Sequence, residues 1–587
     1  MPHMNKKEVA RVLNELGALL ELQGENPFKA RAYYNGARTI ESLAENIKTV
    51  VDSGEIGNLQ GIGHALEEKI TELVTTGRME YYDELKSRIP EGLFEILEIP
   101  GLGPKKVRKI WQELEVTTLG ELEYACQENR LVDLDGFGAK TQDKVLEGIA
   151  FLKKYQERWL ISDALDAAKP LHRFLSGHPK VHRADIAGSL RRRMETVKDI
   201  DLVASAPEDA RDRITEDFIS QATVEEVIAR GSTKTSVRLD NGLQADLRLV
   251  AHSQFPFALH HFTGSKEHNT AMRSRARKQD LTMNEYGLFN GEGRALSCTD
   301  EREIFSALGL HYIPPELREN MGEIEFAAES EIPRLLKDED IQGIIHVHSN
   351  YSDGVMSIRE LVEECAGLGY SYLGLTDHSQ SAFYANGLKP NRLEEQWEEV
   401  AAVQEAFPEF TIFRGIESDI LPDGSLDYDE EILGEFDFVI ASVHSHFRLE
   451  KAKQTERLLR AVQNPFTTIL GHPTGRLLLA REEYEVDMNA VIEEAGATGT
   501  AIEINANPRR LDLDWRLGRL AGKHGVMTVI SPDAHSPEAL RYLQYGVGIA
   551  RKGWFRADDV INAWDAGTVS EYFGKTRLTN QKDKAKL

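Results

Sequence analysis

Cysteine is scarce in this chain of 587 residues, which has three of them, Cys126, Cys298 and Cys365, at distant positions. An odd and scattered set excludes a disulfide framework and a Cys-x-x-Cys zinc site, and it favours reduced thiols. Apolar runs are short: no stretch approaches the ~18 to 20 residues of a membrane span, and no signal peptide precedes the first helical pattern. The sequence therefore predicts a cytoplasmic protein without membrane contact.

Positive charge is also in deficit, with a formal net charge of -26. Phosphate contacts need Lys and Arg, so this balance argues at first against a nucleic-acid partner. Most of the deficit falls after residue 320, however, and basic runs lie before it at 105–109, 191–193 and 273–278. Local basic patches can still bind phosphates, so the composition leaves the partner open.

The length predicts three or four domains, because one hydrophobic core rarely serves so long a chain. Up to about residue 157 the apolar spacing is helical, and strands mix with helices after it. An acidic connector follows at 323–342, and from residue 343 short apolar runs alternate with amphipathic helices. Such alternation is typical of a β/α fold.

The helical part contains a near-repeat of an apolar residue, Gly-x-Gly and a helix, at 59–70, 99–110 and 134–145. The glycines allow positive φ and close approach of a phosphate, which the amides of the next helix N-terminus would face. One copy could be a tight connection between packed helices, but three copies favour binding of the DNA backbone. The units resemble helix-hairpin-helix motifs, and the candidate DNA-binding residues are Gly61, Gly63, Gly101, Gly103 and Lys105.

Two aspartates, Asp199 and Asp201, lie on one face of a predicted strand, and Asp246 lies on another. Three carboxylates on neighbouring strands can hold two Mg²⁺ ions, one activating an attacking hydroxyl group and one neutralising phosphates. Gly188, Ser189 and Arg192 would then hold a triphosphate. The alternative is a set of surface aspartates on an edge strand, which the preceding Gly-Ser and basic run make weaker.

The stretch GIIHVHSNYSDG at 343–354 places His346, His348 and Asp353 at the end of an apolar run. Alone it could equally be a pair of satisfied core histidines. Six more apolar runs follow, and nearly all end in His, Asp or Glu. In a β/α barrel the carboxyl ends of the strands form one mouth, so these side chains would converge there. The alternative interpretation, histidines scattered over the surface, would need a separate explanation for the polar residue at each strand end.

Three segments resemble the palm and thumb of family X DNA polymerases: GSLRRRMETVKDID, ADLRLV and HFTGSKEHNTAMRSRARKQDLTMNEYGLF. The resemblance covers about residues 1–320. It implies that Asp199, Asp201 and Asp246 hold Mg²⁺ or Mn²⁺, and that Ser189 and Arg192 contact the incoming triphosphate. It also implies that Phe262 and Gly264 lie along the sugar, while Asn269 and Arg273 face the nascent base pair or the template.

The same resemblance assigns roles in the N-terminal region. Lys69 matches the Schiff-base lysine that removes 5′-deoxyribose phosphate, and Lys29 and Tyr33 match 5′-phosphate contacts. Phe28 and Ala65 depart from the family pattern by replacing polar partners, which weakens the expectation of lyase action. His261 and Lys266 also depart from it, at positions beside the sugar and the base.

The C-terminal part resembles the polymerase-and-histidinol-phosphatase (PHP) domain, a metal-dependent phosphoesterase barrel of seven strands. The resemblance implies nine ligands for up to three Mn²⁺, Zn²⁺ or Fe ions. They are His346, His348, Asp353, His378, Glu417, His444, His472, Asp533 and His535. Asp419, His446 and Arg476 are further candidates for substrate contact.

The whole chain resembles a bacterial family X DNA polymerase with a C-terminal PHP domain. The expected regions are an 8-kDa-like helix-hairpin-helix domain (1–90), a fingers domain with further helix-hairpin-helix units (91–157), an α+β palm of nucleotidyltransferase fold (158–260), a thumb (261–322), a linker (323–342), a distorted (β/α)7 barrel (343–575) and a polar tail (576–587).

The expected function is gap-filling DNA synthesis in base excision or end-joining repair, coupled to a metal-dependent 3′-5′ exonuclease or phosphoesterase that could also nick abasic sites. The expected partners of this monomer are gapped or nicked double-stranded DNA and deoxynucleoside triphosphates. Two alternatives stay open: a nucleotidyltransferase for a non-DNA acceptor, and a non-polymerising DNA-end binding module coupled to a phosphoesterase.

Overall fold

The computed structural model describes residues 4–574, apart from short gaps at 44, 60, 91, 115, 120–121, 123–125, 127–130, 132–133, 135, 156–157, 383–384 and 480–481. The predicted polar tail lies outside the described residues. The chain divides into two compact units, Met1–Glu157 and Arg158–Leu587.

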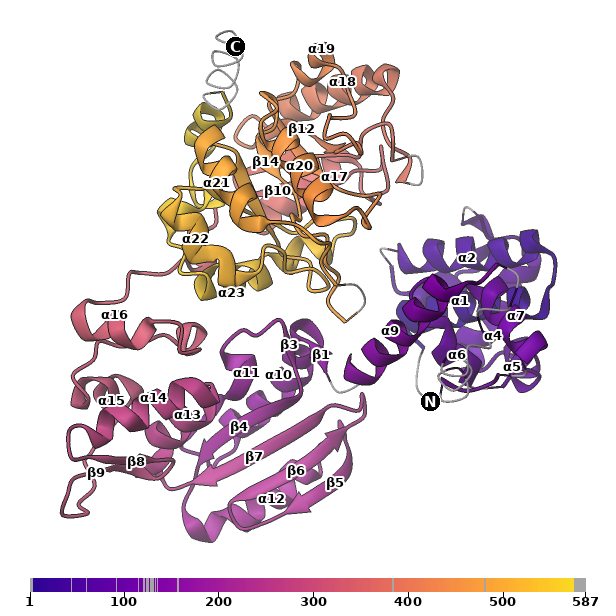
Figure 1. The fold of residues 1–587 in the computed structure, drawn as a ribbon. Coiled ribbons are helices and arrows are strands. Elements are labelled where there is room, and N and C mark those ends of the chain that lie inside the picture. Colours follow the sequence, from indigo (N-terminus) through magenta and orange to yellow (C-terminus); the bar gives the residue numbers. More distant parts are fainter. Residues whose placement is uncertain are drawn as a thin grey trace. The chain divides into compact units, whose positions relative to one another are not determined.

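The first unit is built from helices (Figure 1). Their bounds are α1 (Lys6–Gln23), α2 (Pro27–Glu41), α3 (Ile47–Asp52), η1 (Ile56–Asn58), α4 (His64–Thr76), α5 (Glu80–Ser87), α6 (Gly92–Leu97), α7 (Pro104–Leu114) and α9 (Ala139–Tyr155). Asn5 caps α1 in a capping box with Glu8, and Gly24 ends the helix in the left-handed conformation. The apolar faces of these helices enclose one core, from Val9 to Ile149.

The three Gly-x-Gly units have one geometry in this unit. Their first glycines, Gly61, Gly101 and Gly136, have φ of +83°, +87° and +84°, which a residue with a Cβ atom rarely adopts. Their second glycines precede α4, α7 and α9 directly. Each unit thus presents the amide groups of a helix N-terminus beside a tight turn.

The second unit starts with a five-stranded sheet in the order β2-β4-β7-β6-β5, of which β4, β7, β6 and β5 are labelled in Figure 1. The strands are β2 (Arg183–Ile186), β4 (Asp199–Ser205), β5 (Val224–Arg230), β6 (Lys234–Leu239) and β7 (Gln244–Val250), with the short pair β1 (Trp159–Leu160) and β3 (Thr196–Val197) beside them. β4 and β7 are parallel, and the other pairs of the sheet are antiparallel. The accompanying helices are α10 (Ile161–Gly177), α11 (Gly188–Arg191), η2 (Glu208–Ala210) and α12 (Arg211–Ile219).

A mostly helical segment follows the sheet. It contains η3 (His252–Gln254), α13 (Phe255–Thr263), α14 (Lys266–Arg277), β8 (Thr282–Asn284), β9 (Gly287–Phe289), α15 (Glu301–Ala307), η4 (Pro315–Leu317), α16 (Glu323–Glu329) and η5 (Asp338–Asp340). Helix α13 spans the predicted palm–thumb boundary, and α16 lies in the segment predicted as a linker. A buried ion cluster joins this segment to α11: Glu301 pairs with Arg191 at 2.7 Å and with Arg318 at 2.5 Å.

Removing one cation from this cluster tests its contribution to stability. Arg318 is fully buried and also donates to the carbonyl of Ile313. We expect Arg318→Met to lower the free energy of unfolding by about 3–5 kcal/mol, because it leaves Glu301 buried with incomplete charge compensation. Urea unfolding followed by tryptophan fluorescence measures this change. The control is Arg294→Met, whose side chain is 81% exposed, and an equal shift in both variants would contradict the prediction.

The last part of the unit is a seven-stranded parallel sheet with its strands in sequence order. Figure 1 labels β10, β12 and β14 of this sheet. Its strands are β10 (Gly343–Val347), β11 (Tyr372–Leu375), β12 (Thr411–Asp419), β13 (Phe438–Ser442), β14 (Ile469–Leu470), β15 (Ala501–Asn505) and β16 (Thr528–Ser531). A parallel bridge between Val347 and Ala534 brings the first and last strands together, so the sheet is a nearly closed barrel. The predicted fold class is confirmed, because each of the seven apolar runs forms one of these strands.

Helices connect the barrel strands and cover them. They are α17 (Ile358–Gly367), α18 (Pro390–Ala406), α19 (Glu430–Leu433), α20 (Lys451–Val462), α21 (Met488–Thr498), η7 (Trp515–Leu517), α22 (Gly518–Lys523), η8 (Ala539–Tyr542), α23 (Leu543–Lys552), η9 (Ala557–Asp559) and η10 (Ile561–Ala563).

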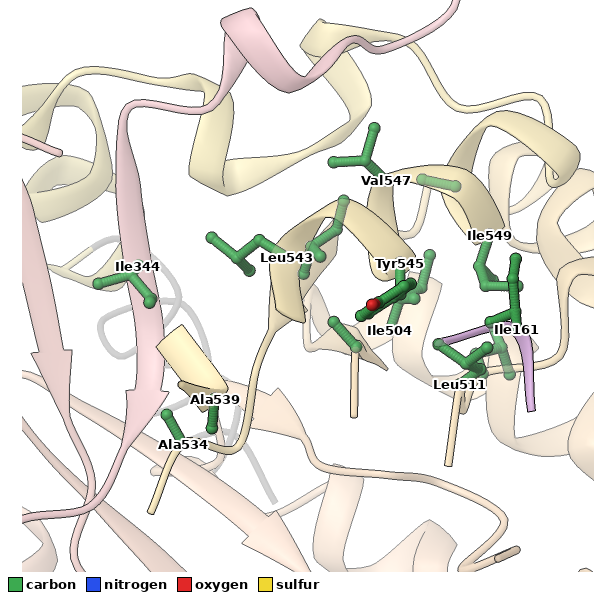
Figure 2. Close-up of a cluster of buried hydrophobic side chains, with 14 of the residues drawn as sticks. Ile161, Ile344, Ile504, Leu511, Ala534, Ala539, Leu543, Tyr545, Val547 and Ile549 are labelled. Carbon is green, nitrogen blue, oxygen red and sulfur yellow. The ribbon is translucent and has the colours of Figure 1, made fainter. Parts of the chain in front are cut away.

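The barrel and the five-stranded part share a hydrophobic core. Figure 2 shows Ile161, at the start of α10, among Ile549 of α23 and Leu511 of the barrel. All three side chains are at most 2% exposed. Helix α23 therefore packs against both parts of the unit.

Candidate active sites

The predicted carboxylates meet on two adjacent parallel strands. Asp201 of β4 is in register with Asp246 of β7, and Asp199 lies two residues earlier on the same face of β4. Gly188 closes the site from the side: a Cβ atom there would lie 2.4 Å from the Asp201 carboxylate, and its φ is +66°. The glycine of the Gly-Ser pair is required because it lets the loop approach Asp201.

Mutual repulsion and burial set the charge of this site. Burial raises the pKa of Asp201 to about 7, and the carboxylates of Asp199 and Asp246 add to that rise. Burial opposes ionisation of Asp246 too, but hydrogen bonds from Lys234, Ser236 and Gln244 outweigh it and lower the pKa. Clustered carboxylates with a raised pKa are stabilised by divalent cations, so this donor set fits a Mg²⁺ or Mn²⁺ site.

The predicted nucleotide-binding residues lie on α11, α13 and α14 and directly after α11 and α13. Arg192 donates to Glu319 at 2.9 Å and to the carbonyl of Thr263 at 2.7 Å. Asn269 donates to the carbonyls of His261 and Gly264, and so fixes the end of α13. Ser189 lies in α11, directly after Gly188, and Arg273 lies in α14 and is half-buried.

Two cations beside this site were missed by the sequence analysis. Lys234 lies 2.6 Å from Asp246, and Arg248 stacks over the ring of Phe262 at 3.9 Å. Alternation along β7 could have found Arg248, because it stands two residues after Asp246 and shares its face. No local signal pointed to Lys234, which reaches the site from the antiparallel neighbour β6.

The second candidate site lies at the carboxyl ends of the barrel strands. Glu417 is its centre: its carboxylate oxygens lie within 3.6 Å of a ring nitrogen of His346, His348, His378, His444 and His472. Asp533 lies 3.3 Å from His348, and Asp353 lies 3.2 Å from His535. The structure therefore brings all nine predicted ligands into one cluster.

The donor atoms of this cluster fit metal ions. They form three groups that could hold an ion: His348, Asp353, His378 and His535; His346, His348 and Asp533; and His378, Glu417 and His444. Among the described residues, both ring nitrogens of the fully buried His348 and Nδ1 of His472 lack a hydrogen-bond partner. Separations of 3.2–3.6 Å between donor atoms match two ligands at about 2.1 Å around one tetrahedral ion.

The imidazoles of the cluster differ in charge, because their surroundings move their pKa values in opposite directions. Burial would lower the pKa of His378, but Glu417 and Asp353 raise it to about 11. Burial and the neighbouring His535 and His378 lower the pKa of His348 to about 3, which keeps it neutral, the form that binds metal. The carboxylates thus favour positive charge at the centre of the cluster.

Two carboxylates orient the imidazoles from outside the cluster. Glu503 contacts Nδ1 of His346 at 2.5 Å and accepts a hydrogen bond from the backbone amide of His472. Asp419 contacts Nδ1 of His444 at 2.5 Å. Such partners fix the tautomer and the direction of a ligating imidazole. The sequence pattern suggested substrate contact for Asp419 and did not single out Glu503, so this orienting role was not predicted for either residue.

Other strand-end polar residues have different partners. Asp377 is fully buried and accepts hydrogen bonds from Ser349, Ser352 and Gln396, so it holds the loop after β10. Arg476 pairs with Glu195 and Asp514, and it donates to the carbonyls of Arg510 and Leu511. Its guanidinium is therefore engaged between the barrel and the five-stranded part.

The first unit brings the predicted 5′-phosphate residues together. Nζ of Lys69 lies 4.9 Å and Nζ of Lys29 5.5 Å from the ring centroid of Tyr81, and Tyr33 stacks on the same ring. Phe28, which precedes Lys29 in the chain, is 76% exposed. Two lysines and two tyrosines thus form a basic aromatic surface that suits a phosphate.

Four family models match this chain. They are a helix-hairpin-helix domain (residues 4–79), a SAM-like helix-hairpin-helix tandem (94–150), the DNA polymerase beta thumb (258–319) and the PHP domain (345–507). The DNA polymerase/3′-5′ exonuclease PolX of Bacillus subtilis is 40% identical over 563 residues, which are 95% of this chain and 98% of that protein.

The chain belongs to the family X DNA polymerases with a PHP domain.

Two more distant relatives each match only part of this family X polymerase. DNA polymerase lambda of Rattus norvegicus is 23% identical over 341 residues, 53% of this chain and 56% of that protein. A probable phosphatase of Syntrophotalea carbinolica is 31% identical over 228 residues, 37% of this chain and 90% of that protein. The predicted family is confirmed. Of the helices that the structure describes in this polymerase, none combines the length and the apolar character of a membrane span.

Proposed function

We propose that this chain is a DNA-directed DNA polymerase that fills short gaps during base excision or end-joining repair, and that its barrel is a metal-dependent 3′-5′ exonuclease and phosphoesterase. The observation that carries the proposal is the presence of two complete donor clusters in one chain, one of carboxylates and one of imidazoles and carboxylates. The B. subtilis relative, named for both activities, spans the whole arrangement.

In the polymerase site, Asp199, Asp201 and Asp246 would hold two Mg²⁺ or Mn²⁺ ions. Bound there, the ions would activate the primer hydroxyl group and neutralise the triphosphate. Ser189, which lies in α11, and Arg192, the residue directly after this helix, bind the triphosphate. Gly188 has no side chain and so lets this segment approach Asp201 closely. Phe262, Gly264, Asn269 and Arg273 line the nucleotide and the template from α13 and α14.

In the barrel, the nine clustered side chains would hold up to three Mn²⁺, Zn²⁺ or Fe ions. These ions would supply a nucleophile from water at neutral pH and stabilise the leaving oxygen of a phosphodiester. Glu503 and Asp419 keep the His346 and His444 rings in the orientation that binds metal. The substrates are 3′-terminal nucleotides or blocking groups, and abasic sites are a further substrate.

The first unit binds the duplex beside the gap. Gly61, Gly63, Gly101, Gly103 and Lys105 contact the sugar-phosphate backbone through helix N-termini, as their turn geometry supports. Lys29, Tyr33 and Lys69 bind a 5′-phosphate, and Lys69 is the candidate Schiff-base lysine. The enzyme acts as a monomer in the cytoplasm on gapped or nicked DNA and deoxynucleoside triphosphates.

The 5′-phosphate site predicts a binding effect that depends on one chemical group. We expect Lys69→Met to weaken binding of gapped DNA that carries a 5′-phosphate by about tenfold, because a charge-assisted contact is lost. The same gap without the phosphate should bind equally to variant and wild type. Fluorescence anisotropy on both duplexes measures this, and Lys48→Met, an exposed lysine of α3, is the control. Equal weakening on both duplexes would contradict a 5′-phosphate contact.

One experiment tests the proposed function as a whole. A labelled gapped duplex is incubated with the enzyme and with Mg²⁺, Mn²⁺ or Zn²⁺ in turn, with and without deoxynucleoside triphosphates. We expect template-directed extension with triphosphates and 3′-5′ shortening without them. Failure to extend with any ion would favour a DNA-end binding module, and extension without a template would favour another nucleotidyltransferase.

A further inference from the structure

Helix α23 of the barrel (Leu543–Lys552) carries one buried cation that contacts the polymerase part. Lys552 is 1% exposed, and its ammonium group donates to three oxygen atoms, all from the other part of the unit. They are the carbonyls of Arg192 at 2.9 Å and Glu316 at 3.1 Å, and the Glu319 carboxylate at 2.7 Å. An ammonium group has three donors, so every one is used.

The oxygen of Glu319 that Lys552 contacts is also bound by Arg192. The distance from Nε of Arg192 to Oε1 of Glu319 is 2.9 Å. Arg192 is the proposed triphosphate ligand, while its neighbour Arg191 is engaged by Glu301 and Thr263. A carboxylate of the polymerase part is therefore shared between a nucleotide-binding arginine and a barrel lysine.

The position of Lys552 is fixed by its surroundings. Its ammonium group lies 4.4 Å from the ring centroid of Trp515, and one turn earlier Gly548 packs against the side chain of Arg193, where a Cβ atom would meet three carbons at 3.4 Å. Ile549 packs against Ile161 in the shared core (Figure 2). These contacts hold α23 against the loop that carries Arg192.

We propose that Lys552 is a positioning residue for nucleotide binding, which acts from the PHP domain through Glu319 on Arg192. The proposal rests on the proposed function, in which Arg192 binds the triphosphate. Glu319 and a triphosphate are both anions that attract the same guanidinium. Lys552 compensates the charge of Glu319, so Arg192 can exchange this carboxylate for the triphosphate. The barrel thereby sets the affinity of the polymerase site for its nucleotide.

Steady-state nucleotide addition by the full chain on gapped DNA tests the proposal. We expect Lys552→Met to raise the KM for the deoxynucleoside triphosphate about tenfold, because Glu319 then holds Arg192 alone, with kcat changed by less than about twofold. Hydrolysis of bis(p-nitrophenyl) phosphate by the barrel should stay unchanged. In the double variant Lys552→Met/Glu319→Gln, the KM should return to within about twofold of wild type, since the competing charge is gone.

The matched control is Arg551→Met, which removes the neighbouring cation of α23. Arg551 also contacts the polymerase part, because it donates a hydrogen bond to the carboxylate of Glu316. It does not contact Arg192 or Glu319 among the described residues. A purely structural role of α23 predicts the same KM in both single variants, and that result would overturn the proposal. An unchanged KM in Lys552→Met, or a raised KM that persists in the double variant, would also overturn it.

Two further outcomes are separated by design. If Lys552→Met does not fold, Glu319→Gln alone tests the same contact. We then expect a lower KM for the deoxynucleoside triphosphate. An unchanged or higher KM would overturn the proposal. If the wild-type chain adds no nucleotide with Mg²⁺ or Mn²⁺, the proposed function fails. If it does add nucleotide and the variants do not differ, only the role of Lys552 fails.

Discussion

Asp201→Asn should reduce nucleotide addition by about 10³-fold or more while leaving 3′-5′ hydrolysis intact. Asp201 is in register with Asp246 and lies two residues after Asp199, so removing its charge takes away one of the three carboxylates that would hold the two proposed metal ions. Loss of several kcal/mol of transition-state stabilisation corresponds to this factor. Single-nucleotide extension of a labelled gapped duplex measures addition, and shortening of the same primer without triphosphates measures hydrolysis.

The control for this variant is Asp240→Asn, an exposed aspartate between β6 and β7 of the same sheet. It changes the charge equally without touching the carboxylate cluster, so both activities should be retained. Loss of both activities in Asp201→Asn would contradict the assignment of two independent sites. Retained addition would remove Asp201 from the polymerase site.

Glu417→Gln should have the opposite effect, with a loss of 3′-5′ hydrolysis of about 10³-fold and nucleotide addition within about twofold of wild type. Glu417 is buried among five imidazoles and is the only carboxylate shared by all of them among the described residues. A neutral amide cannot replace its charge between ions. The purified variant should also hold less metal, which elemental analysis of dialysed protein measures independently of activity.

Glu435→Gln is the matched control, because this glutamate is exposed before β13 and lies outside the cluster. It should keep its metal content and both activities. A normal metal content in Glu417→Gln would show that Glu417 is not a ligand. Loss of metal with full hydrolysis would place the hydrolytic chemistry elsewhere in the chain.

The strand-end pattern predicted a β/α barrel with polar side chains at one mouth, and the resemblance to the PHP domain supplied the nine members of its cluster. Simple alternation along the first strand does not explain how both of its histidines point into the cluster, however. His346 has φ of +68°, and the register between β10 and β11 shifts between Ile345 and Val347. This bulge, and not alternation alone, directs both His346 and His348 into the cluster. A bulge depends on the neighbouring strand, so the local sequence does not reveal it.

The sequence also did not predict ion pairs between residues of distant segments. Arg476 follows His472 at a strand end and looked like a substrate contact, but Glu195 lies 3.7 Å away and Asp514 2.8 Å away. Lys234 reaches Asp246 from an adjacent antiparallel strand. These assignments depend on which segments pack together, and that information is spread over the whole chain.

The sequence by itself determined the family, the seven β/α strands and the types of donor that accumulate at their ends, because short motifs and periodicity are local properties. Only the tertiary structure decided which of those donors lie close enough to share an ion, which carboxylates orient them from outside, and that Lys552 contacts Glu319 and Arg192. The physical reason is that a hydrogen bond or ion pair forms between groups that packing brings within about 3 Å, whatever their separation along the chain.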